Sequence, residues 1–294
     1  MTENVEVTAE PSAAPEAGDG FESMDSGPRR LRDPGQPLGV RELFEAGVHF
    51  GHQTKRWNPK MRQFIYGSRS GIHIIDLDLT AQHFKRAFDF IVETVSRGGS
   101  VLFVGTKRQA QDIVRQEVER CSMFYVTNRW LGGTLTNFRT IKGGLDRLRS
   151  LERMREDGTY EQLPKKETVR LEKERARLEK YLGGLKGMGS LPQAVFVIDP
   201  AQESIAINEA RRLKIPIIAI TDTNCDPDLV DYIIPGNDDA IRSIRLITSA
   251  VSDACLHGVS RRREHGSSRE SAGGRPGVDT AVIYQSPRSR SQES

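Results

Sequence analysis

Short apolar runs alternate with amphipathic helical patterns through the middle of the 294-residue chain. The runs cover residues 72–77, 101–104, 123–126, 194–198 and 217–220, with a shorter one at 232–234. The helical patterns cover residues 80–97, where Thr80 can cap the first turn, and residues 108–120, 203–213 and 239–257. Strands that are apolar on both faces and separated by helices are typical of a parallel sheet covered on both sides. The pattern therefore predicts an α/β fold with a doubly wound parallel five-stranded sheet, in the strand order 2-1-3-4-5.

Residues 134–184 interrupt this alternation, because they show no strand pattern and are dense in Leu, Arg, Lys and Glu. Leucines at helical spacing lie on both sides of a turn at residues 157–159. They are Leu145, Leu148 and Leu151, followed by Met154, in the first arm, and Leu171, Leu178, Leu182 and Leu185 in the second. A narrow apolar seam under a charged surface predicts an antiparallel helical coiled-coil hairpin. This hairpin is inserted into a sheet domain made of residues 39–133 and 185–258.

The two ends of the chain differ from the middle in composition. Residues 1–38 are acidic, residues 259–294 are rich in Arg and Ser, and neither segment has periodic apolar positions. Such segments cannot bury enough apolar surface to offset the entropy lost on ordering. We therefore expect a disordered tail at each end, although the net charge of the whole chain is only +3.

Composition also excludes several classes of protein. No apolar run approaches the roughly 18 residues of a membrane-spanning helix. The acidic first segment has no apolar stretch like that of a secretory signal, so we expect a cytoplasmic protein. The three cysteines are far apart and form no C-x-x-C pair, which argues against a disulfide framework and a cysteine-based zinc site.

Cations and aromatic residues are interleaved in two segments, residues 55–66 and 128–139, which contain both tryptophans of the chain. Lys and Arg neutralise phosphates while planar rings stack on unpaired bases, and this combination is expected of RNA contact. The alternative is two solvated, charged loops with a few anchoring aromatics. A helix that begins near residue 108 adds two more cations. The candidate RNA-contact residues are Lys55, Arg56, Trp57, Lys60, Arg62, Lys107, Arg108, Arg129, Trp130 and Arg139.

An enzyme acting at the carboxyl edge of the sheet is the alternative interpretation. Asp222, Asp226 and Asp228 follow a predicted strand and could hold Mg²⁺ or exchange protons, although Asp near Pro also forms turns and caps. Residues 105–107 could hold a phosphate, contact RNA or be a plain turn between strand and helix. They lack the spacing of a P-loop, and no serine or cysteine lies in a nucleophile motif. We assign no catalytic residue.

Two histidines, His49 and His52, are close enough in sequence to share a metal ion if a third ligand comes from elsewhere. No third ligand is identifiable from spacing, and Gly47 and Gly51 indicate a turn rather than a zinc-binding helix. We expect no cofactor, with zinc at His49 and His52 as the alternative to structural or RNA-contact histidines.

Several motifs recur along the chain in one order. They are GVHFGH at 47–52, WNPKM at 57–61, FVGTK at 103–107, RWLGGTLTNF at 129–138, DTN at 222–224, DP at 226–227 and IPGNDDA at 234–240. Together they resemble the family of the second protein of the bacterial small ribosomal subunit, from about residue 39 to 258. The resemblance implies a flavodoxin-like α/β domain with an inserted helical hairpin, and a structural protein that is not an enzyme and has no small-molecule substrate.

The same resemblance implies particular partners. They are 16S ribosomal RNA near the junction of the head and body of the subunit, and neighbouring ribosomal proteins. Among these is the large OB-fold protein S-one, which captures messenger RNA and which this family helps to attach. The resemblance does not cover residues 1–38 or 259–294.

Overall fold

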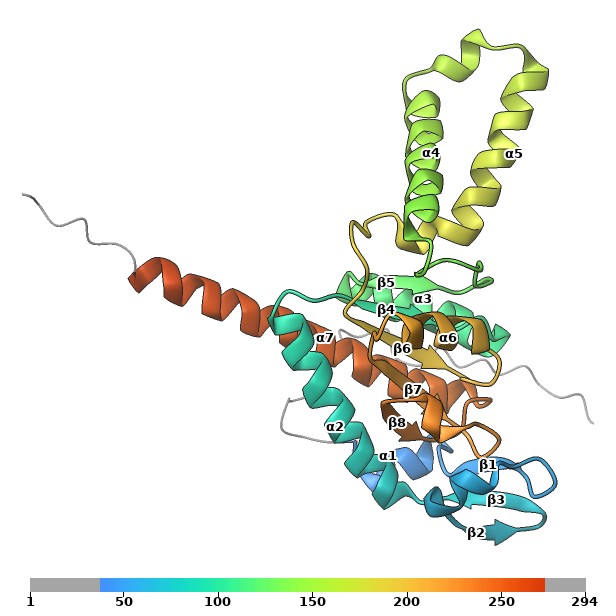
Figure 1. Cartoon of the computed structure of the whole chain (residues 1–294), viewed down its shortest axis with the longest axis vertical. Coiled ribbons are helices and arrows are strands. Elements are labelled where there is room, and N and C mark those ends of the chain that lie inside the picture. Colours follow the sequence, from blue (N-terminus) through green and yellow to red (C-terminus); the bar gives the residue numbers. More distant parts are fainter. Residues whose placement is uncertain (1–37, 273–294) are drawn as a thin grey trace, which may run out of the picture. The chain divides into compact units, whose positions relative to one another are not determined.

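The computed structural model of the chain describes residues 38–272. Its centre is a sheet of five parallel strands in the order β5-β4-β6-β7-β8 (Figure 1). The strands are β4 (Val101–Val104), β5 (Phe124–Val126), β6 (Ala194–Ile198), β7 (Ile217–Thr221) and β8 (Tyr232–Pro235). Counted along the chain from β4, this is the predicted order 2-1-3-4-5. The predicted α/β class is confirmed, and the parallel sheet is consistent with a flavodoxin-like fold.

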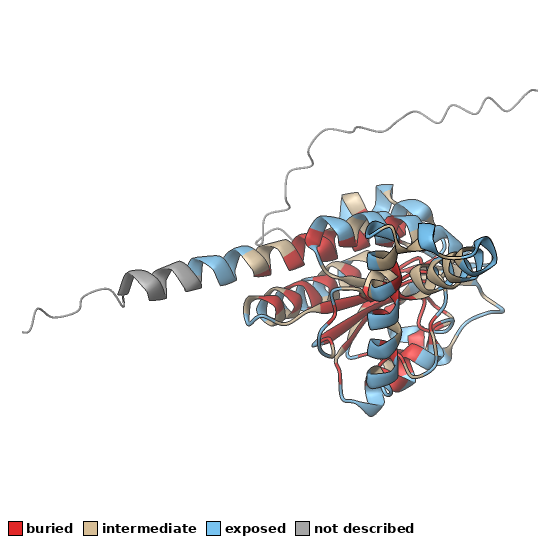
Figure 2. Ribbon diagram, turned by 90° about the horizontal axis from the view of Figure 1, so that it is seen from above, coloured by how far each residue is buried: buried red, intermediate tan, exposed pale blue. Residues whose placement is uncertain are grey.

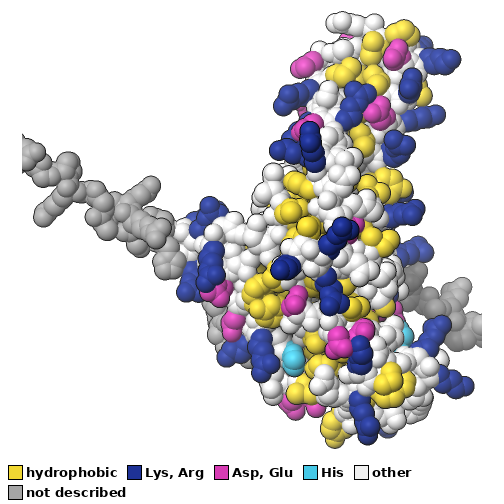
Figure 3. All heavy atoms as spheres, viewed as in Figure 1, with side chains coloured by type: hydrophobic (Ala, Val, Ile, Leu, Met, Phe, Trp, Pro, Cys, Tyr) yellow, Lys and Arg dark blue, Asp and Glu magenta, His cyan; other side chains and the backbone are white. Residues whose placement is uncertain are grey.

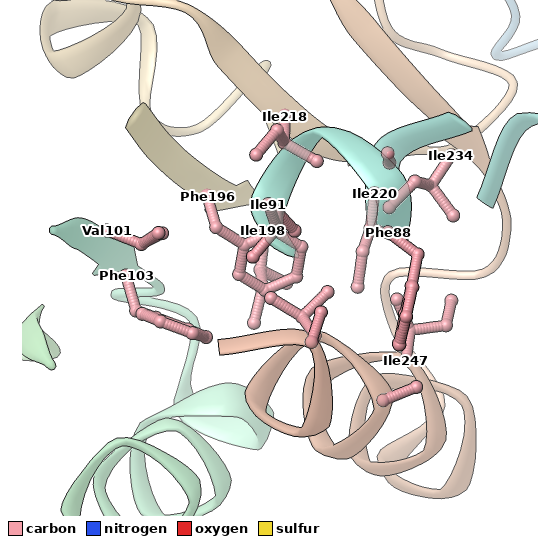
Figure 4. Packing of buried hydrophobic residues seen from close by; sticks show 14 of the residues in the cluster. Phe88, Ile91, Val101, Phe103, Phe196, Ile198, Ile218, Ile220, Ile234 and Ile247 are labelled. Carbon is pink, nitrogen blue, oxygen red and sulfur yellow. The ribbon is translucent and has the colours of Figure 1, made fainter. Parts of the chain in front are cut away.

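Helices cover both faces of the sheet because its central strands are apolar on both sides. The helices are α2 (Leu77–Ser96), α3 (Arg108–Cys121) and α7 (Ile241–Ala272) on one face, and α6 (Ser204–Arg212) on the other. Phe103, Phe196 and Ile220 point toward the first group, as Figure 4 shows. The intervening Val104 and Val197 pack with α6 and with leucines of the helical hairpin. Figure 2 shows the buried residues concentrated in this sandwich, with exposed residues on the outer helix faces.

The run at residues 72–77 does not belong to the parallel sheet, so this part of the prediction is wrong. Residues Ile72–Ile75 form β3, the middle strand of a separate antiparallel sheet with β1 (Phe50–Gln53) and β2 (Ile65–Arg69). Ser70 and Gly71, with φ angles of +52° and +76°, make the two-residue turn between β2 and β3. Left-handed residues at both turn positions give the twist that a tight hairpin requires, which favours antiparallel pairing with the neighbouring strand.

The first turn of α2 also begins earlier than predicted, at Leu77 rather than after Thr80. Asp76 caps it, because its carboxylate accepts hydrogen bonds from the backbone N–H groups of Asp78 and Leu79. Thr80 is buried instead, and its hydroxyl donates to the carbonyl of Pro235, 2.8 Å away. A threonine hydroxyl thus joins α2 to the end of β8.

The insertion is a pair of helices, α4 (Phe138–Glu156) and α5 (Lys165–Leu182), followed by the short helix η3 (Gly183–Leu185). Gly144 lies against Leu182, and Arg147 pairs with Glu174 at 2.9 Å, so the helices run antiparallel. Leu145, Leu148 and Leu151 of the predicted seam are buried, whereas Leu171 and Leu178 are half-buried. The coiled-coil geometry of this hairpin stays a prediction.

The ends of the described chain extend the predicted sheet domain. Leu38 is 1% exposed and packs in the core, just before α1 (Val40–Glu45). Helix α7 continues past His257 to Ala272, so residues 259–272 of the predicted disordered tail are helical. The remainder of both predicted tails, residues 1–37 and 273–294, lies outside the described residues. Within residues 38–272, no helix has the length and hydropathy needed to cross a membrane.

Candidate nucleic-acid interface

The first basic segment links β1 to β2 and presents its cations outward. Lys55 and Arg56 are exposed in the turn after β1, and Arg62 is exposed on the short helix η1 (Pro59–Phe64). Trp57 is 37% exposed, and its ring centre lies 5.1 Å from that of His73 on β3. The Trp57 ring therefore contacts His73 while part of it remains open to solvent.

Contacts with the loop after β7 fix the position of this segment. The Lys60 ammonium lies 2.9 Å from the Asp226 carboxylate and 2.6 Å from that of Asp228. The backbone N–H of Asn58 donates to the carbonyl of Thr223 at 2.7 Å. The hydrogen bond from Lys60 lowers the pKa of Asp226, as expected for a carboxylate beside a cation. Lys60, a predicted RNA contact, is thus committed to an ion pair that anchors the segment.

In the second basic segment, between β5 and α4, the tryptophan is buried. Arg129 and Arg139 are exposed, but Trp130 is only 6% exposed and belongs to the core that lies against α6. Its indole Nε1 donates to the Glu209 carboxylate at 3.0 Å. Of the two packing partners that the sequence leaves open for this ring, RNA or the sheet domain, the structure assigns the sheet domain.

Glu209 on α6 organises the whole of this loop. Besides Trp130, its carboxylate accepts backbone hydrogen bonds from Gly133, Leu135 and Thr136, at 2.7 to 3.0 Å. The Thr136 hydroxyl also donates to it. Burial alone would raise the pKa of Glu209, but these donors outweigh burial and lower it. A single buried carboxylate therefore sets the backbone path between Arg129 and Arg139.

Two candidate RNA-contact cations lie at the start of α3. Lys107 is paired within the protein, and Arg108 is exposed. The Lys107 ammonium lies 2.8 Å from Asp238 and 2.5 Å from Asp239, with Asp199 at 3.3 Å. Burial would lower the pKa of Lys107, but these carboxylates raise it well above its ordinary value. The side chain stays charged within the protein, whereas Arg108 is exposed.

The loop at residues 105–107 forms a turn from β4 into α3, and Thr106 bonds within the protein. The backbone N–H and the hydroxyl of Thr106 both donate to the buried Glu203 carboxylate, at 2.9 and 2.5 Å. A Cβ at Gly105 would lie 3.2 Å from Val114 and 3.3 Å from Ile198, so glycine allows α3 to pack closely on the sheet. The N–H and hydroxyl of Thr106 are therefore already bonded within the protein.

The three aspartates of the enzyme interpretation do not converge on one site. Asp226 and Asp228 hold Lys60, and Asp226 also caps the short helix η4 (Pro227–Leu229) through the N–H of Asp228. Asp222 is buried and lies beside His52 instead. Each carboxylate therefore has a structural partner.

A cluster around His52 has the donor set of a cation site. His52, Asp222 and Asp238 each place one ligand atom within 4.8 Å of the others. His52 Nδ1 lies 3.0 Å from Asp222 Oδ2 without hydrogen-bond alignment, and the fully buried Asp238 Oδ2 has no hydrogen-bond partner. An imidazole and carboxylates of this kind fit Zn²⁺ or another divalent cation, which would satisfy both atoms.

Electrostatics in this cluster favour the protonated forms in the protein alone. The Asp222 carboxylate raises the pKa of His52. Burial, together with the charges of Asp199 and Asp222, raises the pKa of Asp238 to about 7. The other predicted histidine, His49, is not a member of any such cluster among residues 38–264. Its ring stacks on Phe44 with 4.5 Å between centres, so the structure does not bring His49 and His52 to one metal.

Sequence reasoning missed Glu209 and Asp238 as organising residues. A signal was present for Glu209, because it shares the apolar face of α6 with Ala206 and Ala210, where an acid needs internal donors. Nothing local distinguishes Asp238 from the exposed Asp239 beside it. Only the packing of β8 and α7 buries one and leaves the other in solvent.

These observations define a class: an α/β scaffold protein with internally paired acids and exposed cations on two anchored loops. Figure 3 shows such cations scattered over one face of the molecule. Residues 43–258 match the family model described as ribosomal protein S2. The chain is also 72% identical over 254 residues to the small ribosomal subunit protein uS2 of Sorangium cellulosum (strain So ce56), covering 86% of this chain and 91% of that protein. The chain therefore belongs to the ribosomal protein S2 family, whose members are structural ribosomal proteins and not enzymes.

Proposed function

We propose that this chain is a structural component of the small subunit of the cytoplasmic ribosome and binds 16S ribosomal RNA near the junction of head and body. The observation that carries this proposal is the pair of anchored loops that hold cations outward. Their exposed members, with one cation of α3, are Lys55, Arg56, Trp57, Arg62, Arg108, Arg129 and Arg139. Fixed backbones reduce the entropy lost when these side chains bind phosphates. Lys60 and Trp130 anchor the two loops to the rest of the protein, and Lys107 is paired with Asp238 and Asp239.

We further propose that the chain helps to attach the OB-fold protein S-one through an apolar surface at α1 and the start of α7. Phe44, Phe50 and Ile241 are 61%, 47% and 54% exposed there. They line a depression of about 720 Å³ together with His49. Exposed aromatic side chains around a hollow are typical of protein contact rather than of phosphate binding.

Cosedimentation with small subunits tests the RNA-binding proposal. Small subunits stripped of this protein are incubated with the full chain and separated on a sucrose gradient at several salt concentrations. One double variant is Lys55→Gln with Arg56→Gln, and the other is Arg129→Gln with Arg139→Gln. We expect each of them to lower the affinity for the subunit and to reduce the dependence of that affinity on salt. The exposed pair Lys85→Gln with Arg86→Gln on α2 removes the same charge and serves as the control.

The melting temperature should stay unchanged in all three double variants, because none of these side chains has an ion pair among residues 38–264. Association that survives both loop variants unaltered would refute RNA contact by the loops.

Attachment of S-one is tested separately. Phe44→Ala with Phe50→Ala should leave the chain on the subunit while reducing the amount of bound S-one. Equal S-one content in variant and wild type would refute that part.

A further inference from the structure

One face of α5 carries a straight row of cations that the sequence analysis did not single out. Counted along the helix, they are Lys166, Arg170, Lys173, Arg177 and Lys180, and all five are exposed. Their spacing alternates between four and three residues, which places them on a single side of an α-helix. We call these five residues the α5 basic stripe.

Three of the four acids of α5 form ion pairs with residues outside the stripe, and the fourth, Glu167, is exposed. Glu172 pairs with Arg175, Glu174 with Arg147 of α4, and Glu179 with Lys186. None of the five stripe residues takes part in an ion pair within residues 38–264. The Lys180 ammonium lies over the ring of its neighbour Tyr181, with 5.8 Å to the ring centre.

The stripe concentrates positive charge along a line. Five cations over fifteen residues extend about 21 Å along the helix axis, or roughly 5 Å per charge. This spacing is shorter than the Debye length of about 8 Å at physiological ionic strength, so their fields add. Like charges at these spacings destabilise an isolated helix, and Glu174, whose pKa Arg170 and Arg177 help to lower, is itself hydrogen-bonded to Arg147. Figure 3 shows dark-blue side chains along the edge of the hairpin that α5 forms.

We propose that the α5 basic stripe binds the phosphate backbone of ribosomal RNA as a second contact, separate from the two loops. Lys is depleted at protein–protein interfaces, which are enriched in aromatic residues, and among the residues of α5 Val169 is the one exposed large apolar side chain. A row of cations without such anchors suits a regularly charged polyanion. The inference rests on the proposed function, because it adds a contact to the same RNA.

Salt-dependent association of the full chain with stripped small subunits tests the stripe. The stripe variant is Arg170→Gln with Lys173→Gln and Arg177→Gln. The matched control is Lys142→Gln with Arg153→Gln and Arg155→Gln, three exposed cations of α4. Three lost phosphate contacts should reduce the slope of log affinity against log salt by about 2 to 3, while the control keeps the wild-type slope. Both variants should keep their helical circular dichroism, because Gln, Lys and Arg have similar helix propensities.

A tethered cleavage reagent gives an independent measurement. Cys121, Cys225 and Cys255 are at most 2% exposed, so Val169→Cys is the reactive thiol within the described chain for an iron chelate that releases hydroxyl radicals. We expect cleavage of 16S ribosomal RNA from this position and little from the control Asp146→Cys on α4. Cleavage of a neighbouring protein without RNA cleavage would overturn the stripe in favour of a protein partner.

The two proposals fail in different ways. If wild-type chain associates but the stripe variant keeps the slope of the α4 control, the stripe is refuted and the two-loop proposal stands. If wild-type chain does not associate with the subunit at all, the proposed function is refuted and the stripe with it.

Discussion

Trp57 and Trp130 have similar neighbours in the sequence but differ in how far the fold buries them. Each follows an arginine in a basic segment, and each segment leaves cations exposed. Trp57 is 37% exposed and rests on His73, whereas Trp130 is 6% exposed and is held by Glu209. A tryptophan among cations is therefore compatible with a surface ring or with an internal anchor.

The two loops also differ in how they are anchored. Ion pairs from Lys60 to Asp226 and Asp228 hold the first loop. Neutral donors around one buried carboxylate, Glu209, hold the second. Exposed ion pairs are screened by salt, while hydrogen bonds in the interior are not. We therefore expect the first loop to respond to salt, and the second to respond to changes in packing.

The largest expected difference is between Trp130→Ala and Trp57→Ala. Trp130→Ala removes a buried ring and should reduce the free energy of unfolding by about 3 to 5 kcal/mol. Trp57→Ala should reduce it by about 1 kcal/mol or less, because part of this ring is already in solvent. Urea denaturation of both variants at one pH measures the contrast. Equal losses would show that the two rings contribute alike to the fold.

Glu209→Gln should cause the next largest effect. The amide keeps the shape but turns one acceptor oxygen into a donor, so buried N–H groups of the loop lose their partner at a cost of about 2 to 3 kcal/mol. The Trp130 indole N–H resonance in a proton–nitrogen NMR spectrum should move as well. Glu119→Gln, an exposed position on α3, is the control and should change neither quantity. An unmoved indole resonance would contradict the role of Glu209 in holding this ring.

A pH effect on stability should arise from Asp238 in the His52 cluster. Asp238 has a pKa of about 7 in the protein against about 3.9 when unfolded, so the folded state binds more protons between these values. Stability should therefore fall as pH rises from about 4 to 7, and the raised pKa of His52 extends the fall slightly higher. Melting temperatures of wild type and Asp238→Asn across this range measure the effect, which the variant should reduce.

Zinc reverses this dependence if it binds the cluster, because a metal ion favours deprotonated ligands. Added Zn²⁺ should then raise the melting temperature more at pH 8 than at pH 6.

The control for the metal-free prediction is Asp238→Asn. If its pH profile of melting temperature were identical to that of wild type, the pH effect could not be assigned to Asp238.

Much of the sheet was predictable because its strands are apolar on both faces and short. The runs at 101–104 and 194–198 coincide with β4 and β6, and the helical pattern at 108–120 ends one residue before α3 does. The misplaced run at 72–77 shows the limit of this reasoning. Its apolar residues are compatible with either sheet, and only the pairing partners in β1 and β2 decided between them.

The candidate interface was predictable as a region but not residue by residue. Both basic segments reach the surface, as the interleaved cations indicate. Lys60, Lys107 and Trp130 nevertheless have partners within the protein, and these partners lie far away in sequence. Separations of 79 residues between Trp130 and Glu209, and of 131 between Lys107 and Asp238, cannot be read from local spacing.

The sequence by itself determined the class of fold, the helical insertion and the location of the cations, since periodicity and local charge are properties of neighbouring residues. The motifs also determined the family. The tertiary structure alone decided which cations stay free for a partner, which acids are buried, and that His52 rather than His49 faces Asp222 and Asp238. These outcomes depend on the carboxyl ends of β6, β7 and β8 meeting at one edge, where charges from distant segments pair in a medium of low polarity.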